Sequence, residues 1–207
     1  MKKKSLKKYK IICFDLDGVI INSIKNMEIA WNKTSKKNDL NIQFSMYKKF
    51  LGFPFLQILK KLKIKKDFKK IQKDFYYFSN LNLNKIKTYP GIKNFIKYVL
   101  KNYIFCIITS KDKSRALKCL KNNSINYDLI LCPSDKIKGK PSNESINYIK
   151  NKYKVNNRDI VYIGDTVHDY TFAKNSKIDF IHARWGYGTK FKSKYFSNLP
   201  KNLIKFI

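Results

Sequence analysis

Short apolar runs recur along the chain, and stretches with apolar residues at helical spacing separate most of them. Runs of three to five apolar residues bounded by polar ones are typical of strands that are buried on both faces of a sheet. Strands that alternate with helices form a parallel sheet covered by helices on both faces. The predicted strands are 11–14, 104–108, 129–131, 160–163 and 180–183, and the predicted helices are 91–102, 112–122, 142–153 and 169–176.

The stretch from 20 to 86 has a different pattern and contains no clear strand. Apolar residues such as Ile24 and Met27 recur there at the spacing of amphipathic helices. We therefore expect a small helical domain inserted after the first strand. The sequence predicts an α/β fold with a doubly wound parallel sheet, built from residues 1–19 and 87–207, and an inserted α-helical domain over residues 20–86.

Composition narrows the class of protein without identifying a partner. The chain has 207 residues, 43% of them hydrophobic, as expected of a globular protein with a substantial core. Its net charge of +31 would suit a polyanion partner, but only Arg115, Arg158 and Arg184 among its 45 basic residues are arginine. Base readout and bidentate phosphate binding favour arginine. A general lysine bias therefore explains the charge better than a nucleic-acid partner does.

Neither the amino terminus nor the cysteines indicate export. Only four apolar residues separate the basic start MKKKSLKKYK from Asp15, whereas a signal peptide needs roughly 7–15 of them. No segment approaches the ~20 apolar residues of a membrane span. The cysteines at positions 13, 106, 119 and 132 form no CxxC pair, which favours free buried thiols over a disulfide or a zinc site. These patterns predict a cytoplasmic protein without a membrane partner, and none of them indicates an oligomeric state.

Polar clusters lie after or between the predicted strands. Because the carboxyl ends of parallel strands meet at one edge of a sheet, we expect these clusters to converge there. Together they offer carboxylates, a hydroxyl group, backbone N–H groups and a lysine, which is the equipment for phosphoryl transfer with a bound cation. The clusters are DLDG at 15–18, TSK at 109–111, GKPS at 139–142 and GDTVHD at 164–169.

With these four clusters in this order, the chain resembles the haloacid dehalogenase-like hydrolase superfamily, and in particular its phosphoglycolate-phosphatase-like branch. The resemblance covers nearly the whole chain, and the helical segment after the first cluster resembles the cap domain of that branch. The run WGYG at 185–188 is also similar to the family's usual ending. The resemblance implies a Mg²⁺-dependent phosphatase that acts on a small phosphorylated metabolite, such as phosphoglycolate or a sugar phosphate.

The resemblance also implies how the reaction would proceed. Asp15 would attack phosphorus and become an aspartyl-phosphate. Asp17 would protonate the leaving oxygen and then take a proton from the water that hydrolyses the intermediate. Thr109 and the backbone N–H of Ser110 would hold phosphoryl oxygens. Lys140 would neutralise the phosphate and the attacking carboxylate, so that two anions can approach each other.

A metal site is implied by the same resemblance. Asp165 would bind Mg²⁺ together with the carboxylate of Asp15 and the backbone carbonyl of Asp17. Asp169 would orient these ligands from close by. His168 occupies a variable position of the last cluster, and we expect it to be an exposed loop residue.

Asp17 also helps to choose among the activities of the superfamily. Its dehalogenases lack this second aspartate, because they need no such acid for the leaving group. The resemblance implies that its phosphosugar mutases grip the sugar phosphate with arginines of the cap. Residues 20–86 contain no arginine, which favours hydrolysis. A phosphosugar mutase remains the alternative enzyme. A polyanion-binding or nucleic-acid-binding protein on the same scaffold is the alternative from another class.

Overall fold

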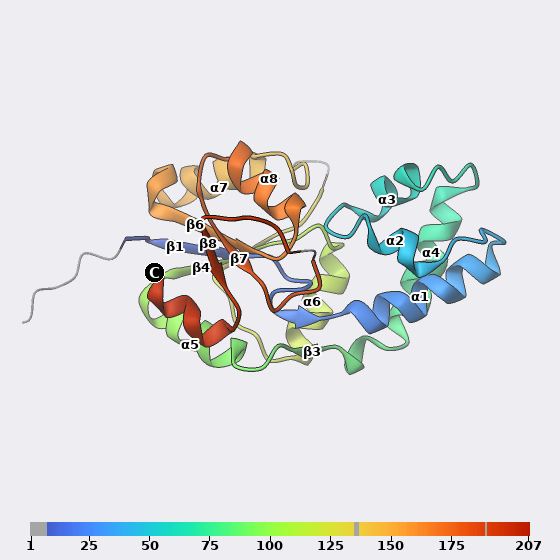
Figure 1. Ribbon diagram of the computed structural model, residues 1–207, viewed down its shortest axis with the longest axis horizontal. Helices are drawn as coiled ribbons and strands as arrows, with labels where there is room; N and C mark the ends of the chain where they lie inside the picture. Colours follow the sequence, from blue (N-terminus) through green and yellow to red (C-terminus); the bar gives the residue numbers. More distant parts are fainter. Residues whose placement is uncertain (1–7, 135–136, 189) are drawn as a thin grey trace, which may run out of the picture.

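A six-stranded, all-parallel sheet organises the fold (Figure 1). The computed structural model describes residues 8–134, 137–188 and 190–207. The strands lie in the order β5-β4-β1-β6-β7-β8, which confirms the predicted doubly wound α/β architecture. The edge strand β8 is not among the predicted strands. The strands are β1 (Ile11–Phe14), β4 (Ile104–Ile108), β5 (Leu129–Leu131), β6 (Ile160–Gly164), β7 (Asp179–Ala183) and β8 (Tyr195–Ser197).

Helices cover both faces of this sheet. Successive strand residues point to opposite sides, so both faces carry apolar side chains that the helices bury. Ile12 of β1 lies in one hydrophobic cluster with residues of α5 and α6, whereas its neighbour Ile11 lies in another with residues of α7 and α8. Figure 1 shows α7 and α8 on one side of the sheet and α5 on the other. The helices are α5 (Ile92–Asn102), α6 (Lys113–Asn122), α7 (Glu144–Tyr153) and α8 (Val167–Asn175).

Four further helices form a second body beside the sheet, which we call the cap (Figure 1). They have a hydrophobic cluster of their own, in which Trp31, Tyr47 and Phe75 are buried. The Trp31 ring stacks on the Tyr47 ring with centroids 4.5 Å apart, and its Nε1 donates a hydrogen bond to the Ile42 carbonyl at 2.9 Å. The cap helices are α1 (Ile24–Lys37), α2 (Phe44–Lys48), α3 (Phe55–Lys61) and α4 (Phe68–Asn80).

A two-stranded antiparallel ribbon joins the cap to the core. It pairs β2 (Ile21–Asn22) with β3 (Lys87–Thr88), so the chain enters and leaves the cap at neighbouring points. The ribbon lies at the positions where the sequence predicts the limits of the insertion, and it supports our proposal that 20–86 is a separate domain. The described residues also form short 3₁₀ helices, η1 (Leu83–Lys85), η2 (Asn157–Asp159) and η3 (Pro200–Lys205).

The helix that follows β6 begins two residues before its predicted start at 169. Thr166 is its N-cap, and the Thr166 Oγ1 accepts a hydrogen bond from the Asp169 N–H at 3.1 Å. The Asp169 carboxylate accepts one from the Thr166 N–H at 3.1 Å in return. This reciprocal pair satisfies two backbone donors of the first turn and places Asp169 inside the helix rather than before it.

The cysteines agree with the expectation from the sequence. All four cysteines are buried and free. In the part of the chain that the structure describes, no helix combines the length and the apolar character that a bilayer crossing requires.

We predict that Ile107→Ala lowers the free energy of unfolding by about 2–5 kcal/mol, because Ile107 is fully buried in β4 and its truncation leaves a cavity against the helices. Urea unfolding followed by circular dichroism measures this loss. Leu56→Ala is the matched control, since its side chain on α3 is 41% exposed, and it should cost less than about 0.5 kcal/mol. Equal losses in the two variants would contradict the assignment of Ile107 to the core.

Candidate active site

The site lies at the carboxyl ends of three neighbouring strands. Asp15 follows β1, Thr109 follows β4 and Asp165 follows β6, and β1 lies between the other two in the sheet. The chain runs outward from β1 in both directions, so the strand order reverses at this place. In open α/β sheets such a switch point is where ligands bind.

A buried lysine ties the site together. Lys140 is 1% exposed, and its Nζ donates to Asp15 Oδ1 at 2.8 Å, to Asp169 Oδ1 at 2.6 Å and to the Tyr162 hydroxyl at 3.0 Å. Burial would lower the pKa of Lys140, but Asp15 and Asp169 outweigh it and hold the pKa above its ordinary value. The ammonium group therefore stays charged and uses all three of its donors.

Three buried carboxylates, Asp15, Asp165 and Asp169, gather around this lysine, with oxygens within 4.8 Å of one another. Asp169 is fully engaged: Oδ1 accepts from Lys140 and from Tyr162, and Oδ2 accepts from Thr166. Burial alone would raise the pKa of Asp169, but Lys140 and Thr166 keep it below its ordinary value. Asp169 is thus an ionised partner of Lys140 rather than a free ligand.

The other two carboxylates are less well compensated. Burial raises the pKa of Asp15 to about 7 although Lys140 lowers it, and burial with repulsion from Asp169 and Asp15 raises the pKa of Asp165 well above its ordinary value. Asp165 Oδ2 accepts from the Gly188 N–H at 2.9 Å, whereas the buried Oδ1 has no hydrogen-bond partner among the described residues. An orphaned oxygen among buried carboxylates fits a hard divalent cation.

The DLDG turn packs tightly against this group. Gly18 has a φ of 91°, and a Cβ added to it would lie 2.3 Å from Asp165 Oδ2. Only glycine allows both the backbone conformation and the close approach. The turn thereby brings its own backbone at Gly18 against the Asp165 carboxylate, beside Asp15.

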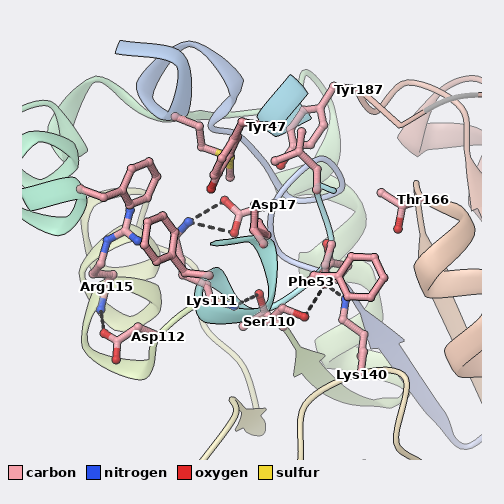
Figure 2. Close-up of a pocket in the computed structure, with 18 of the residues that line it drawn as sticks. Asp17, Tyr47, Phe53, Ser110, Lys111, Asp112, Arg115, Lys140, Thr166 and Tyr187 are labelled. Carbon is pink, nitrogen blue, oxygen red and sulfur yellow. Dashed lines mark hydrogen bonds and ion pairs between the residues drawn. The ribbon is translucent and has the colours of Figure 1, made fainter. Parts of the chain in front are cut away.

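Asp17 is paired with a lysine of its own. Lys111 Nζ donates to the two Asp17 carboxylate oxygens at 2.8 and 2.9 Å (Figure 2). Ser23 Oγ also donates to Asp17 Oδ1. The Lys111 side chain is almost fully buried. The two aspartates of the first cluster therefore have separate cationic partners, Lys140 for Asp15 and Lys111 for Asp17.

A loop of the cap, residues 51–54, closes over the strand ends. Ser110 Oγ donates to the Gly52 carbonyl at 2.6 Å, so the side chain of a predicted phosphate-binding residue holds the cap loop. Phe53 packs on His168 with ring centroids 4.0 Å apart. The expectation that His168 is exposed is wrong, because this loop buries it. Burial lowers the pKa of His168 to about 4, so the imidazole is neutral at pH 7.

A pocket lies between the core and the cap and is partly open to solvent (Figure 2). Its cap side is aromatic and includes Tyr47, Phe75 and Tyr76. Asp165 and Asp169, which the sequence also predicts as site residues, lie in the carboxylate group behind the lining. The predicted residues that line the pocket are Asp15, Asp17, Thr109, Ser110 and Lys140.

Three residues of the site have no role in the sequence-based prediction. Lys111 belongs to the second cluster, but nothing in the sequence distinguishes it from the other lysines. Arg115 lines the pocket from α6, and the scarcity of arginine was a signal that could have singled it out. The Tyr162 hydroxyl accepts from Lys140 and shares its one proton between the Ile108 carbonyl and Asp169 Oδ1. A residue with a polar tip within an apolar strand was the available signal.

Comparison of the sequence with known families finds one match of nearly full length. The profile of the haloacid dehalogenase-like hydrolases matches residues 12–183. A search of curated proteins gives no significant match.

Solved structures of similar fold cover almost the whole chain. A hydrolase of the haloacid dehalogenase-like family from Streptococcus pneumoniae superposes with a TM-score of 0.83 at 20% identity, over 97% of this chain and 99% of that one. A predicted phosphoglycolate phosphatase from Haemophilus somnus gives 0.82 at 19% identity, over 97% and 99%. CbbY from Rhodobacter sphaeroides, solved in complex with phosphate, gives 0.81 at 14% identity, over 94% and 96%.

Lys140→Met should lower the free energy of unfolding by about 3–5 kcal/mol at pH 7, because it leaves Asp15 and Asp169 buried without their shared cation. Urea unfolding in the presence of a chelator measures this without interference from bound metal. The control is Lys138→Met, whose side chain is 82% exposed and whose ion pair with Glu144 is worth little. A Lys140→Met protein as stable as the control would refute the structural role of this lysine.

Proposed function

The chain belongs to the haloacid dehalogenase-like hydrolase family, and we propose that it is a phosphatase that hydrolyses a small phosphorylated metabolite with Mg²⁺ as its cofactor. The observation that carries this proposal is the buried contact between Lys140 and Asp15 at the base of the pocket. A carboxylate that is oriented and neutralised by a lysine can act as a nucleophile toward an anionic ester.

Asp15 is the proposed nucleophile. Its Oδ1 is fixed by Lys140, which limits rotation of the carboxylate and reduces its repulsion of the incoming phosphate. Attack on phosphorus forms an aspartyl-phosphate while the bond between phosphorus and the leaving oxygen breaks. Water then cleaves the intermediate and restores the carboxylate. The Thr109 hydroxyl and the Ser110 backbone N–H follow β4 and line the same pocket, where they would hold phosphoryl oxygens.

Asp17 is the proposed acid and base. It would give a proton to the leaving oxygen in the first step and take one from the attacking water in the second. Lys111 and Ser23 hold its carboxylate, and Figure 2 shows Lys111 on the side of the pocket away from Lys140. Asp17 can therefore face a leaving group while Asp15 faces phosphorus.

Mg²⁺ would be held by the carboxylates of Asp15 and Asp165 and by the backbone carbonyl of Asp17. When bound, it supplies positive charge that stabilises the oxygens of the transferring phosphoryl group. The orphaned Asp165 Oδ1 and the raised pKa of Asp165 support this assignment. Asp169 lies next to these ligands and orients Lys140.

We also propose how the chain is divided and where it works. Residues 1–19 and 87–207 form the catalytic core, and residues 20–86 form the inserted cap. The free buried cysteines support a reducing compartment, and hence a cytoplasmic location.

Phosphatase activity, and its loss in variants of Asp15 and Asp17, tests the proposed mechanism. The protein should release inorganic phosphate from p-nitrophenyl phosphate in the presence of Mg²⁺, and a colorimetric phosphate assay measures the rate. Asp17→Asn should lower kcat by about 10²–10⁴-fold through loss of the proton donor, and Asp15→Asn should lower it at least as much. Asp39→Asn changes an exposed aspartate of the cap and serves as the control. Full activity of Asp15→Asn would refute the mechanism, and conversion of a sugar phosphate isomer without phosphate release would indicate a mutase.

Binding of Mg²⁺ at Asp165 should stabilise the folded protein. Adding Mg²⁺ to chelator-treated protein should raise the free energy of unfolding by about 2.7 kcal/mol when the ion is at 100 times its dissociation constant. Thermal or urea unfolding measures the gain. Asp165→Asn should abolish the gain and should not destabilise the metal-free protein, because it removes one of several crowded buried carboxylates. An equal gain in Asp165→Asn would place the metal elsewhere.

A further inference from the structure

Arg115 carries a positive charge that the described part of the protein does not neutralise. Its side chain is buried, with 5% of the residue exposed. The Nη2 group donates to Ser79 Oγ, but the buried Nε has no hydrogen-bond partner among the described residues. No carboxylate in that part of the chain forms an ion pair with it. A buried guanidinium without a counter-charge is costly unless a ligand completes it.

Aromatic rings surround the Arg115 guanidinium group. The guanidinium carbon lies 4.7 Å from the centre of the Tyr76 ring and 5.5 Å from that of Phe75. These ring contacts offset part of the burial of the charge, but they do not satisfy its N–H donors. Aromatic walls also exclude water, so an anion beside Arg115 would interact with it strongly.

Arg115 belongs to the same pocket as the proposed nucleophile. It reaches the pocket from the first turn of α6, a helix of the core, and in Figure 2 it lies on the side away from Lys140. The other two basic residues of the lining are already paired, Lys140 with Asp15 and Lys111 with Asp17. Arg115 is therefore the basic residue of the described lining that remains available to a substrate.

We propose that Arg115 binds a second oxyanion, a carboxylate or a phosphate, carried by the leaving group of the substrate. This inference rests on the proposed phosphatase function and narrows its substrate class. The phosphoryl group would lie at Asp15, and the second anion would receive the planar fork of N–H groups that suits an oxyanion. Phosphorylated small acids or bisphosphates fit this description, whereas monophosphates of neutral sugars do not.

Two pairs of matched esters test the proposal and separate the two kinds of oxyanion. The first pair is 2-phosphoglycolate and its neutral amide, and the second is ethylene glycol bisphosphate and 2-hydroxyethyl phosphate. In at least one pair, kcat/KM should be ten or more times higher for the ester with the second anion, which is the effect expected of a hydrogen bond between charged groups. The pair that shows the preference identifies the carboxylate or the phosphate. Equal kcat/KM values within both pairs would overturn the proposal.

Variants locate this preference at Arg115. Arg115→Gln should bring the ratio of kcat/KM between charged and neutral esters close to one, and Arg115→Lys should retain part of it because the charge remains without the fork. Arg158→Gln is the control, since Arg158 is exposed on η2, and it should keep the full ratio. A ratio that survives in a folded Arg115→Gln protein would overturn the assignment.

A binding measurement with the unaltered chain covers the case in which Arg115 variants fail to fold. Phosphonoacetate should bind at least tenfold more tightly than methylphosphonate in calorimetry if the pocket holds a second carboxylate, and methylene bisphosphonate should do so if it holds a second phosphate. Equal affinities for all three would overturn the proposal. If 2-phosphoglycolate, ethylene glycol bisphosphate and p-nitrophenyl phosphate are all left unhydrolysed but the affinities differ, the phosphatase assignment fails and the anion site stands. If any of these esters is hydrolysed and the affinities are equal, only the anion site fails.

Discussion

The contact of Lys140 with Asp15 and Asp169 is the interaction on which the site depends. Three carboxylates with oxygens within 4.8 Å of one another would repel strongly in a buried place. Lys140 keeps the pKa of Asp169 below its ordinary value and opposes the effect of burial on the pKa of Asp15. The lysine precedes α7, whereas its partners follow β1 and lie in α8, so one side chain joins three separate segments. The Tyr162 hydroxyl fixes it from β6. The position of the proposed nucleophile is thus a product of core folding.

Core and cap contribute different kinds of group to the pocket. The charged side chains come from the core, at the ends of its strands and in α6. The cap adds aromatic side chains that keep water away, so the interactions between charged groups in the pocket become stronger. The hydrogen bond from Ser110 to the Gly52 carbonyl and the contact of Phe53 with His168 bring the cap loop onto the strand ends. A substrate that touches the Ser110 backbone would therefore lie directly beneath this loop.

The sequence predicts the elements whose residues are apolar on both faces, and it misses those that depend on tertiary partners. The five predicted strands are confirmed, but β8 is a three-residue edge strand without a long apolar run, and β2 and β3 exist only as partners of each other. The strand-end residues are brought together because parallel strands end at one edge. Nothing local marks Lys111 among the many lysines, and the orientation of Arg115 and the burial of His168 depend on the packing of the cap. The early start of α8, in contrast, was readable from the spacing of Thr166 and Asp169.

The pairing of β2 with β3 has a consequence for how such a protein can diversify. Because the chain leaves and re-enters the core at adjacent points, the intervening helices form an insertion with both ends attached at one place. An insertion of another length or shape could be attached at the same place without altering the strand order of the core. The aromatic side of the pocket can then change during evolution while the carboxylates and lysines of the core are retained.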